Sequence, residues 1–120
     1  MIKKIVVAGC RDYTDYQAAK PKLEEIIFPI AKEHTVVILS GDCRGADKLG
    51  ERFALENGFL IERHPADWDT HGRAAGPIRN HEMAREADYV ICFWDGISRG
   101  TKTMIDYAIR EEKEIRIINI

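Results

Sequence analysis

Several features that identify common protein classes are missing from this sequence. Its three cysteines, Cys10, Cys43 and Cys92, include no Cys-x-x-Cys pair, the spacing typical of zinc ribbons and redox motifs, so we expect reduced thiols. No apolar stretch approaches the ~20 residues that cross a bilayer. The apolar run near the start ends at Gly9, too short for a signal-peptide core. We therefore expect a cytoplasmic protein without membrane contact.

An excess of positive charge is also missing. The chain has 18 Lys and Arg against 20 Asp and Glu, a formal net charge of -2. This balance gives no long-range attraction to nucleic acid or anionic lipid, so we expect no general nucleic-acid binding. A chain of 120 residues can bury about two-thirds of its unfolded surface in one core. We therefore expect a single domain over residues 1–120 and no second one.

What the sequence does contain is an alternation of short β-branched runs with helical patterns. The runs lie at residues 5–8, 36–39, 59–64, 89–94 and 115–120. The alternation predicts an α/β fold, a single Rossmann-like three-layer αβα domain with a five-stranded parallel sheet. The second and fourth runs are apolar at every position, as in strands covered on both faces, whereas the third and fifth include polar residues. This favours the strand order 3-2-1-4-5 over 2-1-3-4-5, which would place the second run at an edge.

Helical patterns separate these runs. Apolar stripes at 46–54 and 104–109 have helical spacing, and the first is ended by Asn57-Gly58. Gly76-Pro77 predicts the start of another helix, with proline at the first helical position.

The first helix has conflicting signals. Thr14 to Gln17 follows the capping-box pattern, which predicts a helix start. Pro21 and Pro29 interrupt the pattern that follows, and an interior proline removes a helical hydrogen bond. We therefore expect a kink or a break there.

Three glycine-containing turns lie where an open parallel sheet binds ligands. Such sheets bind outside the carboxyl ends of their strands, where the strand order reverses, here between the first and fourth strands. The turns are 9–13 and 95–101, with 41–47 beside the first. Glycine lets the backbone approach a ligand, and the N–H groups of the following helix attract anions, so we expect a phosphate. No turn matches GxGxxG or GxxxxGK[ST], so neither a dinucleotide fingerprint nor a P-loop is predicted.

Arginines are concentrated at the same edge. The planar guanidinium pairs bidentately with phosphate oxygens, so they favour a phosphate site. The alternative is that they form loop salt bridges with neighbouring aspartates. The arginines are Arg11, Arg44, Arg73, Arg79 and Arg99. The aspartates are Asp12, Asp42, Asp47, Asp67, Asp69 and Asp95.

Residues 65–76 form a long connection between a strand and a helix. One explanation is topological, because the chain must cross from one edge of the sheet to the far side of the first strand. The other is a lid in which Trp68 offers a face to a base and Arg73 reaches a phosphate. Both stay open. The potential metal ligands here are His64, Asp67, Asp69 and His71. Their spacing fits no rigid ligand pattern, so we predict neither a metal nor a cofactor.

Four segments, 9–13, 40–47, 65–80 and 93–101, together resemble the SLOG superfamily. This Rossmann-like group includes the LOG-type phosphoribohydrolases and the DprA/Smf proteins. The whole chain is similar to its YspA/cpYpsA-related branch. The resemblance implies a Rossmann-like fold and a site for a nucleotide or nucleotide-derived ligand.

The LOG motif PGGxGTxxE is matched only in part. In residues 96–106, Gly100-Thr101 aligns, the proline and the paired glycines do not, and a carboxylate comes only at Asp106. The resemblance implies a catalytic role for Asp106. The alternative is an ordinary helical ion-pair row, because Lys102 and Arg110 lie four residues to either side.

The LOG pattern Arg-Lys-x-x-Met resembles residues 79–83, with Asn80 in place of lysine. The resemblance implies that Arg79 holds the phosphate and, with Asp106, forms the catalytic pair. The missing lysine weakens this pair.

Three functions are compatible with these observations. The first is binding or sensing of a nucleotide or a phosphoribosyl or ADP-ribose-like ligand, and the second is N-glycosidic hydrolysis of a nucleotide. The third is single-stranded DNA binding as in DprA relatives, which the net charge of -2 opposes because such sites use a continuous basic groove. The sequence leaves a homo-oligomer open. The predicted ligand-binding residues are Gly9, Arg11, Asp12, Gly41, Arg44, Gly45, Asp47, Trp68, Arg73, Asn80, Trp94, Ser98, Arg99, Gly100 and Thr101.

Overall fold

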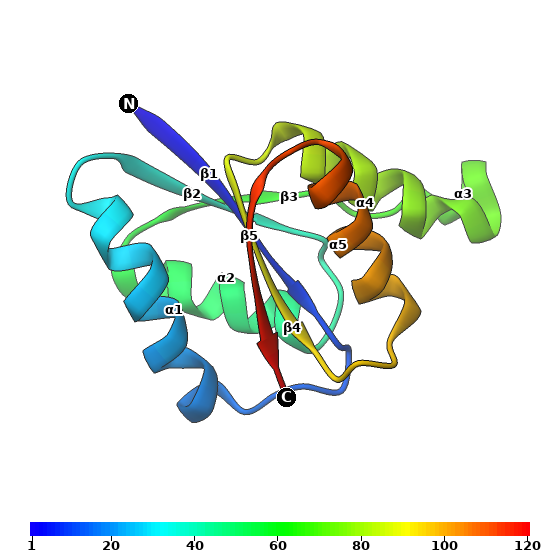
Figure 1. Ribbon diagram of the computed structural model, residues 1–120. Helices are drawn as coiled ribbons and strands as arrows, with labels where there is room; N and C mark the ends of the chain where they lie inside the picture. The colour runs from blue at the N-terminus through cyan, green and yellow to red at the C-terminus, as the bar shows by residue number, and fades with distance from the viewer.

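A computed structural model describes residues 1–120, and its five strands form one parallel sheet in the order β3-β2-β1-β4-β5 (Figure 1). The predicted strand order is therefore confirmed. The apolar strands β2 and β4 lie inside the sheet, and β3 and β5 form its edges. The strands are β1 (Ile2–Gly9), β2 (Thr35–Ser40), β3 (Leu60–Arg63), β4 (Tyr89–Trp94) and β5 (Glu114–Asn119).

Helices cover both faces of the sheet, so the three-layer arrangement is also confirmed. On β1, Ile5 and Val7 pack in the cluster that contains α1 and α2, whereas Val6 and Ala8 pack in the cluster that contains α4 and α5 (Figure 1). Successive side chains of a strand point to opposite faces, so a central strand must be apolar at every position. The long helices are α1 (Tyr16–Ala31), α2 (Ala46–Asn57), α4 (Ala75–Glu86) and α5 (Arg99–Arg110). None is both long and apolar enough to cross a membrane.

Of the kink or break expected in α1, the break is wrong. The helix runs without interruption through Pro21 and Pro29, and its inner face buries Leu23 and Ile27. Both prolines are exposed, so water can satisfy the carbonyls that lose a helical partner. Packing of the apolar face outweighs the local proline penalty.

Two helix starts also differ from expectation. The cap of α1 is Asp15 rather than Thr14, because the Asp15 side chain accepts from the N–H of Ala18. Helix α4 begins at Ala75, so Pro77 occupies its third position. The first turn of a helix tolerates proline throughout, because its N–H groups have no helical acceptor.

The long connection at 65–76 contains a four-residue helix, α3 (Trp68–His71), and a 3-10 turn, η1 (Gly72–Ala74). Neither buries a residue. Helix α3 extends away from the sheet at the right of Figure 1. The connection therefore contributes little to the core.

Candidate functional site

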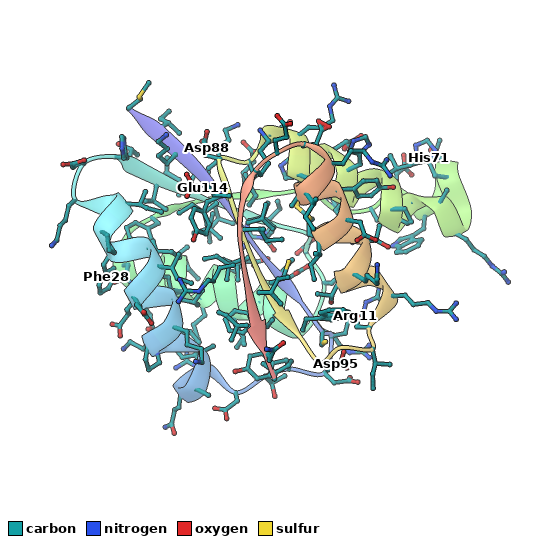
Figure 2. The ribbon with its side chains drawn as sticks, viewed as in Figure 1. Arg11, Phe28, His71, Asp88, Asp95 and Glu114 are labelled. Carbon is teal, nitrogen blue, oxygen red and sulfur yellow. The ribbon has the colours of Figure 1, made fainter.

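A cleft of about 340 Å³ lies at the carboxyl ends of β1 and β4, where the strand order reverses. Arg11 and Asp95, which line it, lie together at this end of the sheet (Figure 2). Asp88 and Glu114 mark the opposite end. The cleft is therefore at the position that the topology predicted.

Most of the predicted site residues line this one cleft, including Arg11, Arg79 and the Gly100-Thr101 turn. Cys10, Cys43 and Asp95 also line the cleft and lie in the predicted turns, but they were not among the predicted ligand-binding residues. The predicted residues in the lining are Gly9, Arg11, Asp12, Arg44, Asp47, Arg79, Asn80, Ser98, Gly100 and Thr101. Those outside it are Gly41, Gly45, Trp68, Arg73, Trp94, Arg99 and Asp106.

Two glycines let the three turns approach one another closely. A Cβ on Gly9 would lie 2.4 Å from the carbonyl oxygen of Phe93, and one on Gly45 would lie 2.4 Å from that of Cys10. Gly45 also has a φ of +81°, which favours glycine. The N–H of Ala46 donates to the Cys10 carbonyl at 3.2 Å. Gly45 thus brings the turns together and is not itself part of the lining.

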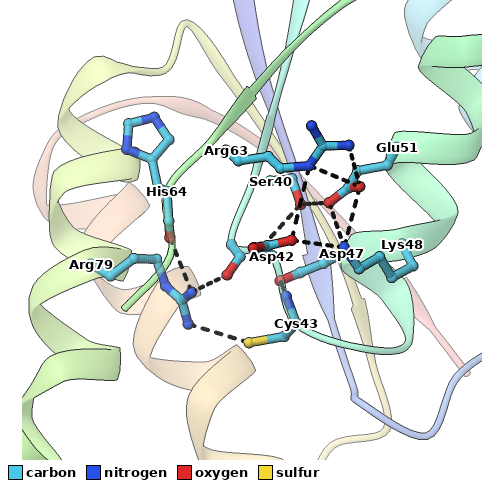
Figure 3. Close-up of polar contacts among 10 residues, drawn as sticks. Ser40, Asp42, Cys43, Asp47, Lys48, Glu51, Arg63, His64 and Arg79 are labelled. Atoms are coloured by element: carbon cyan, nitrogen blue, oxygen red, sulfur yellow. Dashed lines mark hydrogen bonds and ion pairs between the residues drawn. The ribbon is translucent and has the colours of Figure 1, made fainter. Parts of the chain in front are cut away.

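Arg79 is a buried cation, 7% exposed. Its Nη1 donates to the carbonyl oxygens of Gly41 and His64 (Figure 3). Its Nε donates to Asn80 Oδ1 at 2.8 Å. The only acceptor of its Nη2 is the Cys43 thiol, at 3.8 Å. None of the ion pairs in the structure includes Arg79. Its charge is thus held by neutral acceptors beside the cleft.

Asp47 is a buried carboxylate in the same lining, also 7% exposed. Its Oδ2 accepts from the N–H of Cys43 at 3.2 Å. Burial raises the pKa of Asp47 to about 6, although the Cys43 N–H and the charge of Arg79 oppose this rise. Asp47 therefore titrates close to neutral pH.

The N-terminus of α5 forms another wall. No side chain caps it, and Gly100 and Thr101 in its first turn line the cleft. Asp95 holds the preceding turn, because its Oδ1 accepts from the N–H groups of Ile97 and Ser98, each at 2.8 Å. These bonds lower the pKa of Asp95. Uncapped N–H groups and the helix dipole favour an anion.

Several predicted side chains take other positions. Asp106 is half-exposed and lies 3.1 Å from Lys102 Nζ, one of the two pairs of the expected ion-pair row, whereas Arg110 forms no ion pair. Trp94 donates its indole N–H to the Ser98 carbonyl at 3.1 Å, so it supports the α5 turn. Among the five arginines only Arg44 forms an ion pair, with Asp12 at 3.4 Å. Both partners of that pair are exposed, so it contributes little stability.

A second hollow of about 330 Å³ adjoins the cleft. Arg11, Cys43, Arg44 and Trp68 line it, and the first three also line the cleft. Trp68 is 50% exposed, and its ring lies beside Gly76, where a Cβ would be 3.5 Å away. Trp68 therefore offers a flat apolar surface next to the polar cleft.

A dense polar network packs beside the 41–47 turn. Glu51 is buried, and its carboxylate accepts from Ser40 Oγ at 2.6 Å and from Arg63 Nη2 at 2.9 Å (Figure 3). Lys48 Nζ donates to it at 3.3 Å and also pairs with Asp42 at 2.7 Å. Although burial acts in the opposite direction, these donors together lower the pKa of Glu51. The network fixes β2, β3 and α2 relative to one another.

One group of side chains has donors that could hold a metal. The ligand atoms of Glu62, His64 and Glu86 lie within 4.8 Å of one another. His64 Nε2 is 2.6 Å from Glu62, which also pairs with Lys4 at 3.3 Å. These side chains are outside the cleft. The structure thus pairs His64 with glutamates rather than with the aspartates of the 65–76 connection.

Comparison with known proteins places this chain in a family. It is 32% identical over 126 residues to the Gene 61 protein of Mycobacterium phage D29, a match that covers 98% of this chain and 96% of the relative.

The solved structure of DNA processing protein A (DprA) from Streptococcus pneumoniae has the same fold, with a TM-score of 0.75, 22% identity and 98% of this chain covered. This chain spans 50% of that one. A protein named TM1055 matches with a TM-score of 0.68 and 20% identity over 96% of this chain and 72% of its own. Residues 3–71 match the YspA, cpYpsA-related SLOG family, and the chain belongs to that family.

Proposed function

We propose that the cleft binds a nucleotide or a nucleotide-derived ligand through its phosphate. The observation that carries this proposal is the meeting of the uncapped α5 N-terminus with Arg79, a buried cation without an ion-pair partner, in one lining. Both features favour an anion, and they come from elements far apart in the sequence. Arg11 adds a third positive group at the rim.

The rest of the lining favours a ligand larger than a free anion. Three arginines line the cleft, but so do Asp12, Asp47 and Asp95. These carboxylates would repel a free phosphate ion. A nucleotide, in contrast, also carries hydroxyl and N–H groups that can donate hydrogen bonds to them. The volume of about 340 Å³ is within the range of small-molecule sites.

Trp68 gives this ligand a surface for its base. The second hollow shares Arg11, Cys43 and Arg44 with the cleft, so one molecule can occupy both. A base stacked on an exposed indole gains apolar contact without a change in the core.

Binding without turnover is favoured over N-glycosidic hydrolysis. The carboxylate that the LOG motif would supply for hydrolysis is Asp106, and it lies outside the lining with its charge paired to Lys102. Single-stranded DNA binding is disfavoured because arginines and aspartates are balanced in the lining.

Calorimetric titration with AMP, adenosine and inorganic phosphate tests this function. We expect AMP to bind, adenosine to bind at least about tenfold more weakly, and phosphate alone to bind weakly. Arg11→Ala should weaken AMP binding, whereas Arg85→Ala, a matched change of an exposed arginine outside the cleft, should not. Amide NMR signals of Gly100 and Thr101 should shift on AMP addition. Equal binding of AMP and adenosine would contradict the phosphate site.

A further inference from the structure

We propose that Asp47 accepts a hydrogen bond from a ribose hydroxyl of the ligand, so that the cleft prefers ribonucleotides to deoxyribonucleotides. This inference rests on the proposed nucleotide function and deepens it. It assigns a role to the most deeply buried carboxylate in the lining of the cleft.

The two oxygens of Asp47 have different surroundings. Oδ2 accepts from the Cys43 N–H at 3.2 Å, whereas no group of the protein donates to Oδ1. Oδ1 is nevertheless not fully enclosed by the protein. Because Asp47 is 7% exposed and lines the cleft, that opening leads into the cleft.

The hydrogen bonds of the fold do not require a carboxylate here, although the charges of Arg79 and Lys48 partly offset the cost of burying one. One neutral acceptor, as in asparagine, would satisfy the Cys43 N–H, and burying a charge is unfavourable. No ion-pair partner lies within 4.0 Å of Asp47. A charged acceptor with a free oxygen in a ligand cleft instead suits a hydroxyl donor of the ligand.

The position of Asp47 matches the sugar rather than the phosphate or the base. The phosphate is assigned to the Gly100-Thr101 turn and the base to Trp68. Asp47 is bonded to Cys43, which lines both the cleft and the Trp68 hollow. It therefore lies toward the junction of the two, where the sugar that joins base and phosphate would be.

Binding of AMP, 2′-deoxy-AMP and 3′-deoxy-AMP to the wild type and to Asp47→Asn tests the proposal. We expect the wild type to bind at least one deoxy analogue about tenfold or more weakly than AMP, and Asp47→Asn to lose most of that difference. Asp88→Asn is the matched control, because Asp88 is exposed and lies at the opposite end of the sheet, outside the cleft (Figure 2). This variant should keep the preference.

The outcomes separate the two proposals. Equal binding of all three nucleotides by the wild type would overturn the role of Asp47 and leave nucleotide binding intact. A preference that persists in Asp47→Asn would also overturn it. If none of the three nucleotides binds, the proposed function itself fails, and this inference with it. Equal binding by the wild type overturns the role of Asp47 even if the variant does not fold.

Discussion

Asp47 and Glu51 lie one turn apart on α2, and both are buried, yet their surroundings are opposite. Glu51 accepts from Ser40, Lys48 and Arg63, and these donors lower its pKa. Asp47 accepts only from the Cys43 N–H, and burial raises its pKa to about 6. A fully partnered buried carboxylate supports the fold. A buried carboxylate that keeps an unpaired oxygen in a cleft is instead available to a ligand.

The largest effect should come from breaking the Glu51 network. We expect Glu51→Ala to lower the free energy of unfolding by about 3 kcal/mol, because it leaves the buried Ser40 hydroxyl without its acceptor and removes the buried carboxylate partner of Lys48 and Arg63. Urea denaturation at pH 7 measures this. An unchanged midpoint would mean that water replaces the carboxylate.

Asp47→Asn should have the opposite effect and raise the free energy of unfolding. The folded pKa of about 6 lies above the ordinary value of 3.8, so ionising Asp47 destabilises the fold progressively as pH rises from about 4 through 6. We expect the variant to be more stable than the wild type by about 2 kcal/mol at pH 8 and nearly equal at pH 4. Thermal unfolding across this pH range measures the difference. A variant less stable than the wild type at pH 8 would show that the charge supports the fold.

Replacing Asp106 distinguishes the catalytic role from the ion-pair role. Because it is half-exposed and outside the cleft, Asp106→Asn should change AMP affinity less than about twofold. The same protein incubated with AMP measures turnover, and we expect no free adenine from either form. Release of adenine by the wild type that the variant abolishes would instead support the hydrolase.

The smallest effect is expected at the exposed pair of Asp12 and Arg44. Their side chains are 94% and 73% exposed, so solvent screens the interaction. We expect Asp12→Asn to leave the thermal midpoint unchanged within error. A clear loss of stability would show that the pair holds the 9–13 and 41–47 turns together.

The strand order and the turns around the cleft could be predicted because they depend on patterns within the chain. The consecutive apolar residues of β2 and β4 indicate interior strands, and glycines mark the turns. Side-chain direction could not be predicted in the same way. Trp94 bonds to the Ser98 carbonyl, a contact that depends on the path of the loop before α5. The spacing of Lys102 and Asp106 predicted their ion pair as one of two alternatives, but only the orientation of α5 shows that Asp106 lies outside the cleft.

The continuity of α1 could not be predicted either. A local proline penalty is visible in the sequence, but the packing that outweighs it is not. The same limit applies to the pairing of Glu51 with Arg63, because those residues meet only once β3 lies beside β2.

The close contact of Gly9 and Gly45 with the neighbouring turns has a consequence for how this site could diversify. Side chains at either position would collide with backbone atoms, so the polar walls tolerate little change. The 65–76 connection buries no residue in α3 or η1. Substitutions around Trp68 therefore carry little folding penalty. Under the proposed function, ligand preference can drift at that outer wall while the end of the cleft at α5 stays constant.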